Sequence, residues 1–126
     1  MKTTLEMAQE LSSIPEQVYA TQLDIIGLND QVEENERAIS NMEIQIKSQV
    51  LAAVDGSGKK IYSNDEARKM AFISDCNENE SYLSLIEQRS ALSKAMQIKR
   101  TEVEMLSNKQ RNLRVLIQSL VGADPF

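Results

Sequence analysis

The sequence predicts an all-α fold, an antiparallel coiled-coil helical hairpin with a short N-terminal helix and a turn made of a loop plus a short helix. Three observations support this prediction. Two long stretches repeat apolar residues every seven positions, a Gly-rich loop signal separates them, and the two stretches carry opposite net charge. A seven-residue repeat held for five or six heptads keeps one seam of each helix facing a partner helix.

Each stretch has two rows of seam positions. In the first stretch they are Val18, Ile25, Val32, Ile39, Ile46 and Ala53, with Thr21, Leu28, Asn35, Met42 and Gln49. In the second stretch they are Tyr82, Arg89, Met96, Val103, Gln110 and Ile117, with Leu85, Leu92, Lys99, Leu106, Leu113 and Leu120. We expect these rows to form the narrow core between two helices.

The first element is a short helix predicted from about Thr4 to Leu11. Thr3 and Glu6 have the spacing of a capping box, which satisfies the free N–H groups at a helix start. Pro15 follows two serines, and proline disrupts a helix interior, so we expect a break or kink there. The first long helix then spans about residues 14–54.

The connector is predicted at residues 55–78. Asp55-Gly56-Ser57-Gly58 is the strongest loop signal in the chain. Ser63 and Glu66 have capping-box spacing, which predicts a short helix from about Asn64.

The last long helix is predicted at about residues 79–121, ended by Gly122 and followed by a tail, Ala123–Phe126. The two long helices come out nearly equal in length, as an antiparallel hairpin requires. The whole chain, residues 1–126, is therefore predicted to be a single hairpin unit.

The charge pattern agrees with antiparallel docking of the two long helices. Residues 16–54 carry a net charge of −5, and residues 89–114 carry +5. Exposed ion pairs contribute only ~0–1 kcal/mol each, so we expect them to set orientation and register rather than stability. If Val54 lies near Glu78 at the turn, facing residue numbers should sum to about 131, which pairs Ile39 with Leu92.

Composition argues against several functional classes. The net charge of −5 and the pI of about 4.8 disfavour nucleic-acid binding by the chain as a whole. A lone Cys76 and the absence of His leave no disulfide framework, transition-metal site or nucleophile–base pair, so we expect no enzyme activity and no cofactor. The sequence shows neither a signal peptide nor a run of the ~18 apolar residues that span a bilayer, so a cytoplasmic location and no membrane partner are expected.

One candidate interaction surface consists of apolar residues outside the seam. These are Tyr19, Leu23, Ile26, Val115 and Leu116. A single hairpin cannot bury two faces, so this stripe needs a cover. Two covers are weighed equally: the N-terminal helix folded back onto it, or a second protomer in a homodimer.

A second candidate surface is a basic stripe on the last helix, comprising Lys94, Lys99, Arg100, Lys109, Arg111 and Arg114. Such a stripe can follow a phosphate backbone. The favoured interpretation is that it faces the acidic first helix, because no aromatic stacking platform accompanies it. In the connector, Ile61, Tyr62, Met70, Phe72 and Ile73 are expected to form a cap on Val50, Leu51 and Val54. The alternative is a presentation tip rimmed by Lys59, Lys60, Arg68 and Lys69.

The connector also carries a resemblance. The segment Gly58–Lys69, followed by an acidic stretch and Tyr82, resembles a pattern in small helical-hairpin proteins of bacterial phages and prophages. Some of those proteins accompany genes for recombination or single-strand annealing. The resemblance implies an accessory role in phage DNA metabolism or interference with host nucleases, and it assigns no catalytic or binding residue.

The leading hypothesis is a non-enzymatic coiled-coil interaction protein that binds itself and an unidentified protein partner. The alternative is an accessory protein of phage DNA recombination or host-nuclease interference that acts through the basic stripe. Exposure of all six basic side chains on one face would favour the alternative. A prefoldin-like holdase, which needs exposed apolar tips, is a third and weaker hypothesis.

Overall fold

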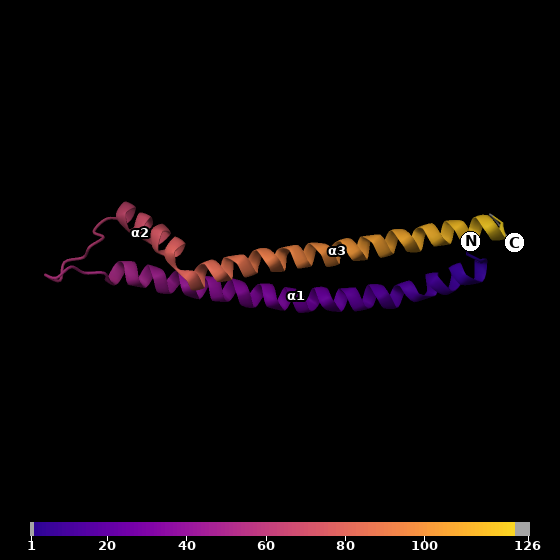
Figure 1. The fold of residues 1–126 in the computed structure, drawn as a ribbon, viewed down its shortest axis with the longest axis horizontal. Helices are drawn as coiled ribbons and strands as arrows, with labels where there is room; N and C mark the ends of the chain where they lie inside the picture. Colours follow the sequence, from indigo (N-terminus) through magenta and orange to yellow (C-terminus); the bar gives the residue numbers. More distant parts are fainter. Residues whose placement is uncertain (1, 123–126) are drawn as a thin grey trace. The chain divides into compact units, whose positions relative to one another are not determined.

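The computed structural model describes residues 2–122 and contains three helices (Figure 1). These are α1 (Thr4–Ala52), α2 (Asp65–Glu78) and α3 (Glu80–Val121). Across the described residues, β-pairing is limited to one isolated bridge between Val54 and Lys60, so the predicted all-α class is confirmed. The predicted tail at residues 123–126 lies outside the described range.

The chain divides into two compact units. Unit 1 comprises Met1–Asn29 and Lys94–Phe126, and unit 2 comprises Asp30–Ser93. The first part of α1 and the last part of α3 therefore belong to unit 1, and unit 2 contains the remainder of both helices together with all of α2. Each unit is described by itself below.

The seam is confirmed by burial in both units. Of its positions, Thr21, Asn35, Ile39, Ile46, Leu92, Met96 and Leu113 are buried, and most others are half-buried. Gln49, Arg89 and Leu120 are the exposed exceptions. The heptad rule therefore identifies the buried face of each long helix correctly.

Of the break or kink predicted at Pro15, the break is wrong, because α1 continues through Pro15, and the kink stays a prediction. An internal proline removes one backbone hydrogen bond and costs about 3 kcal/mol. The neighbouring Ile14 is completely buried, in a cluster with Met7 and Leu113. Burying such side chains is worth about 1.5–3 kcal/mol each, so continuing the helix through Pro15 offsets its cost. Residues 4–52 thus form one helix, and the described part of the chain contains no separate N-terminal helix.

Side-chain caps define the helix boundaries. Thr3 caps α1 as predicted, with its Oγ1 accepting from Glu6 N at 3.1 Å. The start of α2 is capped by Asn64, not Ser63, since Asn64 Oδ1 accepts from Ala67 N at 2.8 Å. The predicted break before the last helix is confirmed at Asn79, and Gly122 follows α3 with a positive φ of 106°.

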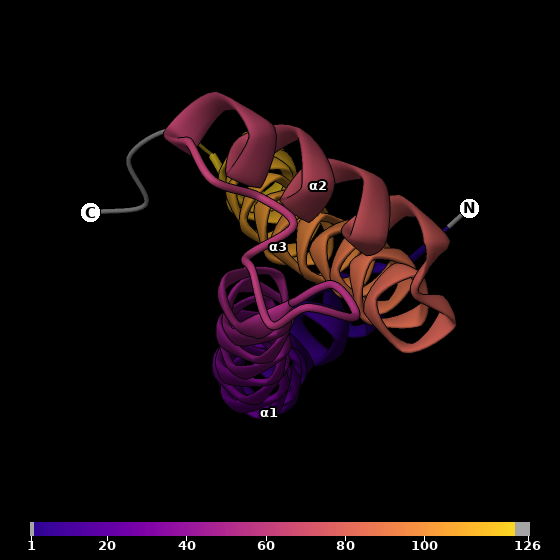
Figure 2. The same ribbon diagram turned by 90° about the vertical axis from the view of Figure 1, so that its left-hand side faces the viewer.

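Unit 2 is a three-helix arrangement in which α2 lies beside the end of α1 (Figures 1 and 2). The antiparallel pairing of α1 and α3 is visible in two contacts. Asn35 Nδ2 donates to Leu85 O at 3.0 Å, and the Tyr82 hydroxyl donates to Glu43 Oε1 at 3.4 Å.

The expected register is wrong in unit 2. It places Asn35 opposite residue 96 and Glu43 opposite residue 88, so the observed partners lie several positions earlier in α3. The reason is α2, whose 14 residues extend about 21 Å. Because α2 occupies the last turns of α1, α3 meets α1 further from the turn than a simple hairpin allows.

The connector loop is held by one carboxylate. Asp55 Oδ1 accepts hydrogen bonds from Ser57 N, Ser57 Oγ and Lys59 N at 2.7–3.1 Å. These bonds, with the Ser57 hydroxyl contributing most, lower the pKa of Asp55 below its usual value. Gly58 takes a positive φ of 82°, a conformation that favours glycine. The plain turn expected here is therefore built from local hydrogen bonds.

The cap predicted over the end of α1 forms only in part. Ala71 and Cys76 of α2 are buried, and Lys47 Nζ lies 5.3 Å from the centre of the Phe72 ring. Val50 is also buried and Tyr62 is half-buried. Five other apolar residues of the predicted cap remain about half exposed or more: Leu51, Val54, Ile61, Met70 and Ile73.

Candidate functional site

A groove runs along one side of α3 in unit 1. Three hollows of about 670, 460 and 420 Å³ make it up, and Met105 lines all three. We call it the unit 1 groove. Its apolar lining consists of Met7 and Ala20 from α1 and Ile98, Met105, Leu106, Leu113, Leu116 and Leu120 from α3. Residues spaced by three, four or seven positions share a helix face, which explains why the α3 members line one groove.

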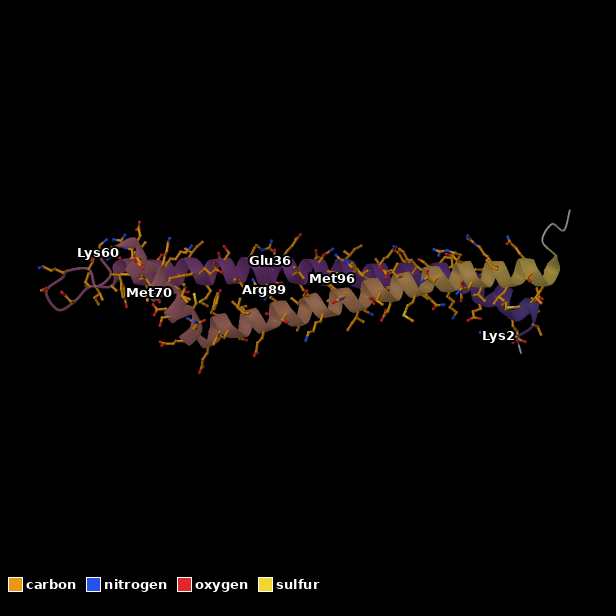
Figure 3. All side chains as sticks on the ribbon, turned by 90° about the horizontal axis from the view of Figure 1, so that it is seen from above. Lys2, Glu36, Lys60, Met70, Arg89 and Met96 are labelled. Carbon is orange, nitrogen blue, oxygen red and sulfur yellow. The ribbon has the colours of Figure 1, made fainter. Side chains whose placement is uncertain are left out.

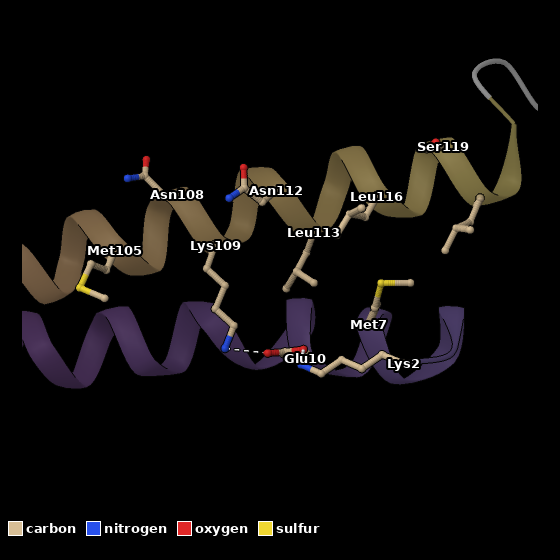
Figure 4. A pocket seen from close by; sticks show the side chains of 11 residues that line it. Lys2, Met7, Glu10, Met105, Asn108, Lys109, Asn112, Leu113, Leu116 and Ser119 are labelled. Carbon is tan, nitrogen blue, oxygen red and sulfur yellow. Dashed lines mark hydrogen bonds and ion pairs between the residues drawn. The ribbon is translucent and has the colours of Figure 1, made fainter.

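The apolar lining is largely uncovered. Ile98 is 60% exposed, Met105 65% and Leu120 58%, although each is a large apolar side chain. Figure 4 shows Leu113 and Leu116 of α3 and Met7 of α1 extending toward the space between the two helices. Exposed apolar side chains arranged in a row mark a contact surface more often than single scattered ones do.

Charged groups bridge the two helices at one end of the groove (Figure 4). The Glu10 carboxylate accepts from Lys109 Nζ and Lys2 Nζ, both at 2.6 Å. The hydrogen bond from Lys109, followed by that from Lys2, lowers the pKa of Glu10 below its usual value. A second ion pair joins Lys99 Nζ to Asp24 at 3.1 Å and raises the pKa of Lys99.

These ion pairs also correct the register in unit 1. The expected register places Glu10 beside residue 121 and Asp24 beside residue 107, whereas their partners are Lys109 and Lys99. The pairing is antiparallel, and the partners lie earlier in α3 than expected, as they do in unit 2.

The structure does not gather the predicted apolar surface into one site. Leu116 lines the unit 1 groove. Tyr19, Leu23 and Ile26 are 48–64% exposed but line none of the three hollows, and Val115 is 59% exposed and lines none either. The two covers predicted for the apolar stripe are a second protomer and an N-terminal helix folded back onto it. The second of these covers is wrong, because residues 4–11 are part of the continuous helix α1.

The predicted basic stripe is also divided. Lys99 and Lys109 turn toward acids of α1, and Lys94 lines the groove beside Ile98. Arg100, Arg111 and Arg114 are exposed, at spacings that place them on one helix face. The stripe is therefore neither wholly paired with α1 nor wholly open.

Sequence reasoning missed Met105, Ile98 and Met7 as surface-forming residues. A signal was present, since Ile98 and Met105 are seven residues apart and repeat on a flank of the seam. Met7 was assigned to a separate helix because Pro15 suggested a break. The continuous α1 is what brings Met7 against α3.

Unit 2 places a thiol, a phenol and a carboxylate near one another: Cys76, Tyr82 and Glu43. Cys76 is buried, and that burial, followed by the charges of Glu43 and Asp75, raises the pKa of its thiol. Burial and Glu43 likewise raise the pKa of Tyr82. Both groups are thereby held protonated at neutral pH, which opposes a nucleophilic role. Within residues 2–122, the acids and Cys76 form no group of three or more that could hold a metal ion.

The connector residues that carry the phage resemblance have structural roles here. Asn64 caps α2, and Arg68 donates to Tyr62 O and Ser63 O while pairing with Asp65 at 3.1 Å. Within residues 2–122, no helix has the length and hydropathy needed to cross a membrane. No protein-family model, curated protein or solved structure matches the chain, so the resemblance stays a prediction.

Proposed function

We propose that this chain is a non-enzymatic helical interaction protein that assembles with a second copy of itself and binds a further protein partner. The observation that carries the proposal is the unit 1 groove, in which Met105 joins three hollows along one side of α3. Such a groove suits a helix that presents apolar side chains at helical spacing. In unit 2 a helix of the same chain takes this place, because α2 packs beside α1.

A second copy fits the groove because the α3 flank is self-complementary in charge. Around Met105, Glu102 lies three residues before and Lys109 four residues after. Antiparallel packing of two grooves about a two-fold axis near Met105 therefore brings Glu102 of each copy close to Lys109 of the other, which also pairs with Glu10 of its own copy. The same packing buries Ile98, Met105 and Leu116 of both copies, and a two-fold interface closes without further addition.

Light scattering after gel filtration tests the dimer. The wild-type chain is expected at twice its 14.2 kDa mass, and Met105→Glu is expected at 14.2 kDa with an unchanged helical circular dichroism spectrum. Met105 is exposed in the single chain, so the substitution does not disturb a core. Ile44→Glu is the matched control: Ile44 is 59% exposed, lies in unit 2, and should leave the dimer intact.

Nucleic-acid binding is the second candidate function, and one observation favours it. Arg100, Arg111 and Arg114 form an exposed basic row on α3. The row is short, because Lys99 and Lys109 are engaged by Asp24 and Glu10. A single-stranded oligonucleotide titrated at two salt concentrations separates the candidates. Binding that weakens with salt and is lost in Arg111→Gln/Arg114→Gln would replace the leading proposal.

A further inference from the structure

A second surface lies at the connector end of unit 2, where basic and apolar side chains occur together. We call it the basic tip, defined by Lys47, Lys59, Lys60, Arg68 and Lys69. Figure 3 places Lys60 and Met70 there, and Figure 2 faces the connector loop and α2. It includes a hollow of about 240 Å³ lined by Lys47, Val50, Leu51, Asp65, Arg68, Lys69 and Phe72, in which Asp65 pairs with Arg68.

The basic groups of the tip are largely uncommitted. Arg68 pairs with Asp65, whereas Lys47 and Lys69 form no ion pair with another described residue. The Asp55 carboxylate accepts hydrogen bonds from the backbone N–H groups of Ser57 and Lys59 in its own turn. Residues 47–70 thus contain five basic residues and three acidic residues, whereas the net charge of the whole chain is −5.

The apolar groups of the tip are equally uncovered. Leu51, which lines the hollow, is 48% exposed, and the half-buried Phe72 and the buried Val50 line it too. Met70 and Ile73 are 67% and 58% exposed but do not line the hollow. Drug-sized ligands occupy pockets of roughly 300–1,000 Å³, so this hollow is too small for one of them. Its volume suits one or two apolar side chains that project from a larger molecule.

We propose that the basic tip binds an acidic amphipathic segment of a protein partner. An apolar side chain of that segment enters the hollow over Val50 and Phe72, and its flanking carboxylates contact Lys47 and Lys69. The rest of the chain is acidic overall, and its other exposed basic row, Arg100, Arg111 and Arg114, lines none of the described hollows, so charge and the hollow together direct the segment to the tip. The inference deepens the proposed function, on which it rests, by naming the class of partner.

An acidic peptide fits this surface better than a phosphate backbone does. A nucleic-acid backbone has no apolar side chain to fill the hollow. Stacking of bases requires an open aromatic face, whereas Phe72 is half-buried beneath Lys47. A bilayer would need a broad apolar area, and here the apolar centre is a hollow ringed by cations.

Fluorescence anisotropy with the full-length protein tests the proposal. The probe is a labelled peptide with Leu at helical spacing and Glu between, and the comparison peptide has each Glu replaced by Lys. We expect saturable binding of the Glu peptide only. Lys47→Glu/Lys69→Glu should weaken it at least about tenfold, as expected when contacts between opposite charges become repulsive.

Two controls make the test specific. Arg111→Glu/Arg114→Glu has the same charge change on the outer face of unit 1 and should leave the affinity of the Glu peptide within about threefold. Met105→Glu should still bind it, so failure of the dimer proposal and failure of the tip proposal are distinguishable. Equal loss in both double variants, no binding of the Glu peptide, or tip-dependent binding of anionic vesicles or DNA in its place would overturn the inference.

Discussion

Unit 1 and unit 2 are built from the same two long helices and the same heptad pattern, yet they bury different amounts of it. In unit 2, α2 adds a third helix, and Val50 and Cys76 are buried in addition to the seam. In unit 1 only two helices meet, so Met105 and Leu116 beside the seam stay exposed. Apolar residues beside a two-helix seam therefore stay exposed unless a further helix packs over them.

The largest effect is expected inside the three-helix unit. Ile46 is 1% exposed, so Ile46→Asp buries a carboxylate without a partner and should cost several kcal/mol of a small domain's ~5–15. Ile44→Asp, two residues away at a 59% exposed position, should change Tm by only a few degrees. Thermal unfolding followed by circular dichroism measures both. Equal melting temperatures would mean that Ile46 does not lie in a core.

The next effect compares the two cores directly. Ile14 in unit 1 and Ile46 in unit 2 are both fully buried, and replacement by Ala costs roughly 2–5 kcal/mol when the cavity cannot collapse. In unit 1 no third helix packs against the seam, so the side chains around a cavity at residue 14 can move in and fill part of it. Ile14→Ala should therefore lower the free energy of unfolding less than Ile46→Ala does. Urea unfolding with a fixed m-value gives the two free energies. A larger loss at Ile14 would contradict the stated difference between the units.

The heptad spacing predicted the seam, as the burial of Ile39, Ile46 and Leu113 confirms. It could not fix the register, because sliding one helix by seven residues pairs the same rows again. The register depends on how α2 occupies the end of α1, which is a tertiary fact. The groove escaped prediction for a related reason: whether a flank residue such as Met105 is covered depends on the number of helices around it.

Asn35 is a second determinant of the register, beside the packing of α2: it is 3% exposed and donates to Leu85 O and Gln88 Oε1, while its own Oδ1 has no hydrogen-bond partner among the described residues. Asn35→Leu should therefore raise stability by about 1 kcal/mol and relax register specificity.

Disulfide formation within one chain reads out that register. With Asn35 present, cysteines at Ile39 and Leu85 should oxidise, and cysteines at Ile39 and Leu92 should not, since a disulfide needs Cα atoms ~4.4–6.8 Å apart. With Asn35→Leu, the second pair should begin to oxidise. Ready oxidation of the second pair in the wild-type background would mean that the register differs from the one described.

The smallest effect concerns ion pairs that join α1 to α3. Unit 1 has two of them, and none occurs in unit 2 among the described residues. The pKa of Glu10 is lowered by Lys109 and Lys2, so its contribution to stability is present above its ordinary value of 4.5 and is lost as pH falls through the lower folded value. Glu10→Gln should therefore lower Tm slightly at pH 6 and leave it nearly unchanged at pH 3. High salt should shrink the difference at pH 6, and a difference that is the same at both pH values would contradict the ion pair.

Asn79 has a consequence for where the chain tolerates a change of length. Its backbone N–H bonds to Cys76 O at the end of α2, while its side chain accepts from Tyr82 N at the start of α3. One residue thus closes one helix and opens the next, and an inserted residue would turn α3 by about 100° relative to α2. In the Asp55–Lys59 loop, by contrast, no atom beyond the neighbouring residues lies within 4 Å of a Cβ added at Gly56, although Gly58, with its positive φ of 82°, should stay glycine. Epitope tags and length variation belong in that loop, and the joint at Asn79 must keep its length.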